Sequence, residues 1–142
     1  MLIKKVIFLS LIMTYGFSGF SDTLIKKRWY TQDDAKQGKI LFLKNCSSCH
    51  GEKAEKTVVW KKTLKDGSYP PPPLNGTAHA WHHPKSQLKR IISKGGAQYD
   101  GKMPPFGSIL TNKEEDFVIA YFQNFWSDEI YERWIKGGGL SR

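Results

Sequence analysis

The stretch Cys46-Ser47-Ser48-Cys49-His50 decides the fold of this 142-residue chain. Two cysteines separated by two residues and followed directly by a histidine form the pattern through which haem is attached covalently to protein. Each thiol adds to one haem vinyl group, and a two-residue gap within a tight helical turn lets both sulfurs reach vinyls on adjacent pyrroles. The imidazole of His50 is then carried under the metal as its proximal ligand. We therefore predict one covalently bound haem c.

A cysteine pair alone would also suit zinc or thiol redox chemistry. These are the only two cysteines, so a zinc site would need His50 and one of the three histidines between residues 79 and 83. A thioredoxin-like redox site would need alternating strands and helices, and the sequence shows no such pattern. The adjacent histidine therefore favours haem over both alternatives.

Residues 1–21 have the composition of a secretory signal. Lys4 and Lys5 precede an apolar run from Val6 to Met13, and Gly-Phe-Ser occurs twice, at 16–18 and 19–21, with small residues suited to a signal peptidase. We predict export to the bacterial periplasm. The alternative is an uncleaved anchor that tethers the protein to the membrane, although the apolar run is short for a bilayer of roughly 30 Å.

The formal net charge of +9 has two interpretations. No nucleic-acid-binding motif is present, and an exported protein seldom meets nucleic acid. The charge is either ordinary solvated surface or a docking face for an acidic redox partner, which would act chiefly on the rate of encounter. The lysines are mildly concentrated after the cysteine motif, at Lys53, Lys56, Lys61, Lys62 and Lys65.

The remaining sequence predicts an all-α fold. Thr31 can cap a helix over Gln32–Asn45 that runs directly into Cys46, and Asp33 and Asp34 suit its first turn. Further helices are expected at about 85–94, from Thr111 to about 126, and from 127 to about 134. Residues 51–77, with four consecutive prolines, form a long loop in which only 57–60 suggest a short strand. A loop of this length is unusual in a compact domain unless it surrounds a bound group, and a haem would be such a group.

The sequence therefore predicts three to four short helices and long loops around one haem. Residues 22–142 would form a single cytochrome domain, and 127–136 would form a short aromatic helical extension of it.

Met103 is the predicted sixth ligand of the iron. It is the one methionine outside residues 1–21, and it lies in the Gly- and Pro-rich stretch Gly101–Pro105. His/Met ligation raises the reduction potential and fills both axial positions. No position is then open to oxygen or peroxide, so electron transfer is expected rather than catalysis. A labile Met103 would instead indicate a haem enzyme or sensor.

His50 needs a second partner for its ring. A proximal histidine normally donates its other N–H to a carbonyl, which fixes the orientation of the imidazole. Pro72 is the candidate acceptor among the four consecutive prolines.

These motifs, in order, resemble class I cytochrome c over nearly all of the chain after residue 21. The resemblance implies that the carbonyl of Pro72 holds the proximal histidine, that Met103 is the distal ligand, and that Gly38 and Phe42 pack against Tyr121 where the first and last helices cross. It is carried by Gly38-x-x-x-Phe42-x-x-Asn45-Cys46-x-x-Cys49-His50-Gly51, Pro72-x-Leu74-x-Gly76, Gly101-x-Met103-Pro104 and Val118-Ile119-Ala120-Tyr121. We also predict cofactor contacts for Leu74, Trp81 and Phe106.

One segment is richer in histidine than this family requires. His79, His82 and His83 fall within five positions, with Trp81 among them. The simplest interpretation is that Trp81 packs on the haem edge while the histidines bind loop carbonyls or the propionates. A copper or zinc site is the alternative, since imidazole suits both metals. Protonation of the cluster would also tune the potential near neutral pH.

Overall fold

The computed structural model describes residues 27–141, and the predicted signal at 1–21 lies outside them. This part of the chain contains no β-strand, only an isolated bridge between Tyr69 and Gly101. The predicted all-α fold is therefore confirmed. The described helices are α1 (Gln32–Asn45), α2 (Ser47–His50), α3 (Lys85–Lys94), α4 (Asn112–Gln123) and α5 (Asp128–Lys136), with the short 3-10 helices η1 (Ala80–His82) and η2 (Ala97–Tyr99).

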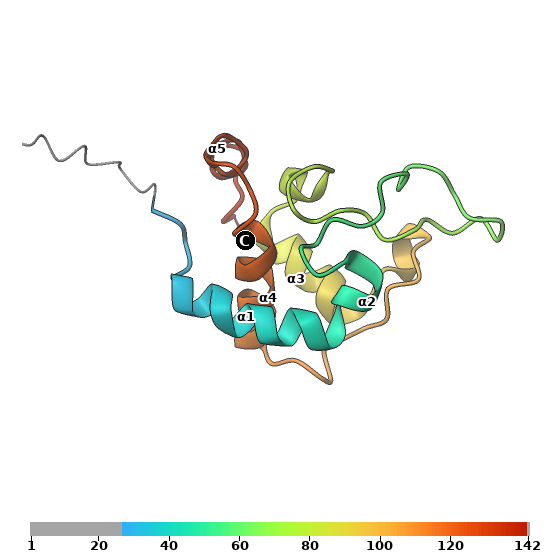
Figure 1. Ribbon diagram of the computed structural model, residues 1–142, viewed down its shortest axis with the longest axis horizontal. Coiled ribbons are helices and arrows are strands. Elements are labelled where there is room, and N and C mark those ends of the chain that lie inside the picture. Colours follow the sequence, from blue (N-terminus) through green and yellow to red (C-terminus); the bar gives the residue numbers. More distant parts are fainter. Residues whose placement is uncertain (1–26, 142) are drawn as a thin grey trace, which may run out of the picture.

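Figure 1 shows the helices gathered together, with the loop between α2 and η1 extending away from them. Residues 58–61 in this loop form turns instead of the suggested strand, since no neighbouring strand pairs with them. Among residues 27–141, no helix combines the length and the apolar character needed to cross a bilayer.

Capping boxes fix the starts of α1 and α4. The Thr31 hydroxyl accepts the N–H of Asp34, and the Asp34 carboxylate accepts the N–H of Thr31; Thr111 and Glu114 repeat the arrangement. Each box satisfies two N–H groups that the helix itself leaves unpaired. Because these signals are local, α1 has the bounds that the sequence predicts.

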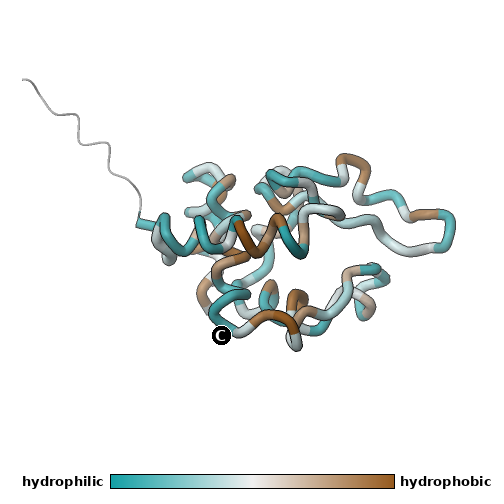
Figure 2. Tube along the Cα trace, turned by 60° about the horizontal axis from the view of Figure 1, so that its bottom comes forward, coloured by the Kyte–Doolittle hydropathy of each residue, from teal (hydrophilic) through white to brown (hydrophobic). Residues whose placement is uncertain are grey.

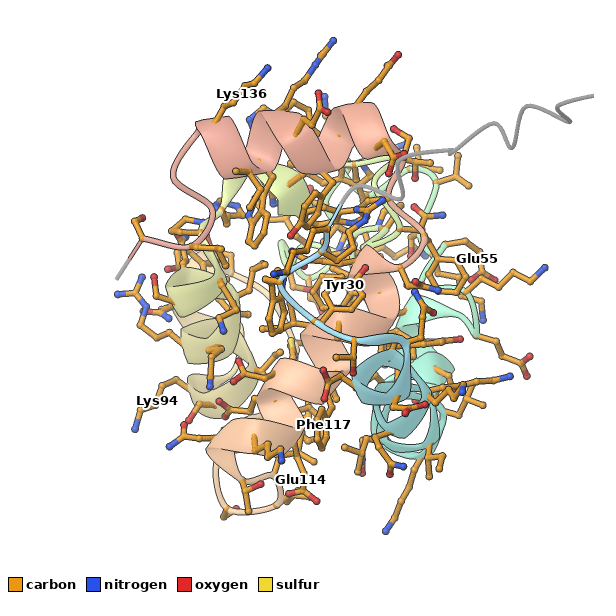
Figure 3. All side chains as sticks on the ribbon, turned by 90° about the vertical axis from the view of Figure 1, so that its left-hand side faces the viewer. Tyr30, Glu55, Lys94, Glu114, Phe117 and Lys136 are labelled. Atoms are coloured by element: carbon orange, nitrogen blue, oxygen red, sulfur yellow. The ribbon has the colours of Figure 1, made fainter. Side chains whose placement is uncertain are left out.

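The crossing of α1 and α4 is the centre of the fold. Phe42 on α1 is fully buried, and its ring lies 5.1 Å from that of Tyr121 on α4. Gly38 lies against the backbone of Phe117, which Figure 3 shows on α4. The absence of a side chain at Gly38 lets the two helices approach this closely.

α4 ends at Gln123, three residues before the predicted end. Residues 124–126 leave the helix in a tight turn, and the indole N–H of Trp126 donates to the carbonyl of Leu74 at 2.7 Å. Ser127 then caps α5 by accepting the N–H of Ile130. The chain thus turns where a distant loop supplies a partner for Trp126.

The aromatic extension covers the protein's own core. Trp126, Tyr131 and Trp134 are each less than 5% exposed. α5 packs against η1, where the indole N–H of Trp134 donates to the carbonyl of His83 at 2.8 Å. The two tryptophans therefore hold both ends of the segment from Leu74 to His83.

Replacing Trp126 with phenylalanine is expected to lower the free energy of unfolding by about 2 kcal/mol, because the substitution leaves the carbonyl of Leu74 without its donor. Urea unfolding followed by circular dichroism measures this change. Trp81→Phe is the control, since the indole N–H of Trp81 makes no hydrogen bond within the described residues. Equal losses in the two variants would show that packing, and not this hydrogen bond, is responsible.

Candidate haem site

A cavity of about 580 Å³ lies between α2, α3, the loop that joins α2 to η1, and the loop that joins α3 to α4. This volume is within the range typical of cofactor sites, roughly 300–1,000 Å³. Its wall is mostly apolar, with side chains from α1, α3 and α4. The apolar residues of these three helices that line it are Phe42, Leu88, Ile91, Ile92, Val118 and Phe122.

The cysteine motif forms a single helical turn on this wall. α1 ends at Asn45, and the carbonyl of the following Cys46 accepts the N–H groups of Cys49 and His50 at 3.2 and 2.9 Å. This turn brings both thiols and the imidazole to one cavity. The two cysteines are free, and burial raises the pKa of the Cys46 thiol to about 11, with a smaller contribution from Cys49. Both sulfurs are thus available for bonding to another group.

His50 is buried, and its Nδ1 lies 3.0 Å from the carbonyl oxygen of Pro72. A carbonyl only accepts, so Nδ1 carries the proton and Nε2 keeps a free lone pair. Burial lowers the pKa of His50, and the hydrogen bond to Pro72 offsets part of this effect. The ring is therefore a neutral imidazole with one nitrogen ready to coordinate a metal.

The loop that carries Pro72 is held on two sides. The N–H of Leu74 donates to the carbonyl of Ala54 at 2.8 Å, and the Leu74 carbonyl accepts the indole N–H of Trp126. Leu74 and Pro72 both line the cavity. The acceptor of His50 is thus fixed by the rest of the fold.

Met103 lines the same cavity, on the loop that follows η2. α3 ends at Gly95 with φ +81°, and the N–H of Gly96 donates to the carbonyl of Met103 at 2.9 Å. A Cβ at Gly95 would lie 2.7 Å from that carbonyl oxygen. The two glycines therefore let the methionine loop lie against the end of α3. Phe106 follows on the cavity wall and is also buried.

The structure thus brings seven of the eight predicted site residues to one cavity. The exception is Trp81, which does not line it. Its ring stacks on His82 at 3.8 Å and lines a smaller cavity of about 150 Å³ together with Trp134. η1 turns this side chain toward α5, so Trp81 does not lie on the wall of the larger cavity, and its contact with the cofactor stays a prediction.

The cavity wall also contains residues that were not predicted as site residues, among them Trp60 and Gln87. Trp60 comes from the long loop, whose sequence has no periodicity that would point to it, and Gln87 comes from α3. His79 and His83 also line the cavity, whereas His82 is exposed. Within residues 27–141, no three His, Cys, Asp or Glu side chains converge as metal ligands would.

Comparison with known proteins decides the family. The family described as cytochrome C oxidase, cbb3-type, subunit III matches residues 33–122. The chain belongs to this family. Neither the curated proteins nor the solved structures gave a significant match. The matched region covers the cysteine motif, the proline loop, the Met103 loop and nearly all of α4, and it stops before α5.

Membership of this cytochrome family confirms the resemblance to class I cytochrome c. The protein is a haem-binding electron-transfer cytochrome, and its cofactor is covalently bound haem c. The cavity fits that cofactor, because it combines apolar walls, two free thiols and a neutral buried imidazole. Cytochromes of this kind exchange electrons with redox partner proteins and are exported or associated with a membrane.

Proposed function

We propose that this cytochrome carries single electrons between larger redox proteins in the bacterial periplasm, and that it holds one haem. In this proposal Cys46 and Cys49 bond the haem, and His50 and Met103 are the axial ligands of its iron. The observation that carries the proposal is the presence of all four side chains on the wall of one cavity. A single haem follows from the cysteine count, since the chain has only these two.

The residues around the iron would set the properties of a one-electron couple. The haem supplies that couple when it is bound. Pro72 orients the imidazole and makes it a better donor by accepting its Nδ1–H. Leu74 and Phe106 pack at the cofactor and exclude water, which favours the less charged ferrous state.

The proposal assigns no catalytic residue to this protein. With His50 and Met103 both bound to iron, no position remains for a substrate. Residues 22–142 form the cytochrome domain with its aromatic extension at 127–136, and residues 1–21 direct export. An uncleaved signal would tether the same domain to the membrane.

An acidic partner would dock on the long loop. Figure 2 shows this loop as an arm with a largely hydrophilic far end. Val58 and Val59 on the arm are 89% and 65% exposed, and apolar groups surrounded by charge are typical of a docking surface. The lysines would steer the encounter, and Trp60 connects the arm to the cavity. The exposed lysines of this region are Lys53, Lys56, Lys61, Lys62 and Lys65.

Absorption spectra of the mature protein, produced with the haem-attachment machinery, test the proposal. The ferric protein is expected to show the charge-transfer band of sulfur on iron, and the ferrous spectrum should not shift under carbon monoxide, because both axial positions are filled. A carbon monoxide shift without the sulfur band would mean a vacant or labile sixth position, and the protein would then be a haem enzyme or sensor.

A further inference from the structure

The loop that carries Met103 is held from two sides. On the side of α3, the N–H of Gly96 donates to the carbonyl of Met103 at 2.9 Å, and the N–H of Gly101 donates to the carbonyl of Gly96 at 3.1 Å. The other side is the arm, the loop between α2 and η1. The N–H of Tyr69 on the arm donates to the carbonyl of Asp100 at 2.8 Å, as part of the isolated parallel bridge between Tyr69 and Gly101. The arm therefore lies against the backbone just before Met103.

Asp66 adds a side-chain contact between the arm and this loop. Its Oδ1 accepts the N–H and the hydroxyl of Ser68 at 3.1 and 2.6 Å, and its Oδ2 pairs with the ammonium group of Lys102. Lys102 and Ser68 together hold the pKa of Asp66 well below its usual range, so the carboxyl is ionised at neutral pH. Ser68 thus holds the carboxylate in place to receive Lys102, the residue that precedes Met103.

The chain leaves Met103 along a restricted path. Pro104 and Pro105 have fixed φ angles, and the N–H of Phe106 donates to the carbonyl of Ile92 on α3 at 2.9 Å. A movement of the Met103 backbone away from the cavity is therefore easiest through the residues before it. These are the residues that the arm holds, so the arm is placed to resist that movement.

We propose that Asp66 is a positioning residue for the sixth ligand: by holding Lys102, it keeps the Met103 loop closed over the iron, and the arm acts as a strap that opposes release of the thioether. The inference rests on the proposed function, because it requires Met103 on the iron. Asp66 does not line the haem cavity, whereas Lys102 and Met103 both do, so Asp66 acts through its neighbour.

The exposure of the ion pair sets the size of the expected effect. The side chains of Lys102 and Asp66 are 63% and 51% exposed. Exposed ion pairs contribute modest free energies, because water screens the two charges. Loss of this pair should therefore make release of Met103 several-fold easier, and it should leave the thioether bound in most molecules.

Imidazole binding to the ferric holoprotein tests the inference. Imidazole can reach the iron only after Met103 has left it, so the apparent affinity for imidazole reports the fraction of molecules with an open sixth position. Asp66→Asn should raise this affinity about fivefold, the size expected for the loss of an exposed ion pair. The ferric sulfur band should persist in the absence of imidazole.

The same substitution in a Met103→Ala background shows whether the effect passes through the ligand. Without a thioether to release, Asp66→Asn should leave the affinity for imidazole unchanged. In the otherwise wild-type protein, Lys102→Gln should raise the affinity as Asp66→Asn does, since either change breaks the same ion pair, and the double variant should exceed neither. A purely electrostatic effect on the iron would instead have opposite signs, because one variant loses a negative charge and the other a positive charge.

Asp33→Asn is the matched control. Asp33 forms an ion pair with Lys36 on α1 at 3.0 Å, and neither side chain lines the haem cavity. This variant removes the same charge and breaks an exposed ion pair of the same kind. It should leave the affinity for imidazole unchanged.

An unchanged affinity in Asp66→Asn would overturn this inference. So would opposite changes in the two single variants, or an equal increase in the Met103→Ala background. Each of these results leaves the sulfur band of the wild-type protein, and with it the proposed function, intact. A wild-type ferric spectrum without the sulfur band, combined with carbon monoxide binding, would instead overturn the proposed function.

Discussion

Replacing Met103 with alanine is expected to lower the reduction potential by on the order of 0.2 V, a fraction of the roughly 0.8 V over which axial ligands set haem potentials. As the proposed ligand, the thioether would stabilise the reduced iron, and alanine offers no ligand in its place. The ferric sulfur band should disappear, and the ferrous protein should bind carbon monoxide. Redox titration and absorption spectroscopy of the holoprotein measure both changes.

Lys102→Gln is the control for this substitution. Lys102 precedes Met103, lines the same cavity and pairs with Asp66, so its replacement removes a charge without removing a ligand. The control should keep the sulfur band and should not bind carbon monoxide. If Met103→Ala also kept the band, Met103 would not be the ligand. The assignment of the sixth position would then have to be abandoned.

Replacing Gly38 with alanine is expected to destabilise the protein by about 2 kcal/mol, the order of the cost of overpacking a core. An added Cβ would collide with the carbonyl oxygen of Phe117, lie 2.5 Å from its carbonyl carbon, and lie 3.0 Å from the Cβ of Tyr121. The first two atoms belong to the backbone of α4 and cannot rotate away. α1 and α4 would have to separate, which would loosen the packing around Phe42.

The direction of the change in stability on Gly38→Ala tests whether the two helices cross at this residue. In an open helix the same substitution stabilises by up to about 1 kcal/mol, because alanine has the higher helix propensity. Thermal unfolding of the holoprotein should show a fall in Tm of several degrees for Gly38→Ala. Gln37→Ala, at the exposed neighbouring position, should leave Tm nearly unchanged. A rise in Tm for Gly38→Ala would show that the helices do not cross at this glycine.

The fold was predictable where the signals are local. Thr31 and Asp34 cap α1 from within one turn, and Gly95 ends α3 at the predicted residue. The end of α4 was not predictable, because Trp126 leaves the helix toward the carbonyl of Leu74, which lies 52 positions earlier. Local patterns carry no information about such a partner.

The same distinction between local signals and distant partners applies to the candidate site. The cysteine turn, His50 and Met103 are marked by motifs, and their presence on one cavity agrees with the sequence-based prediction. Trp81 lies outside this cavity, since the direction of its side chain depends on how η1 packs against Trp134 of α5. The stacking of Trp60 on His79 depends on the path of a long irregular loop, and nothing in the sequence reveals that path.

The partner of His50 determines how the site responds to acid. A histidine held by a carboxylate loses its acceptor when that carboxylate is protonated, so its strength as a donor to iron then varies with pH. The carbonyl of Pro72 has no proton to gain or lose in this range. In the proposed site, His50 would therefore donate to the iron with the same strength across physiological pH. A change of the reduction potential with pH would then have to come from groups other than this ligand.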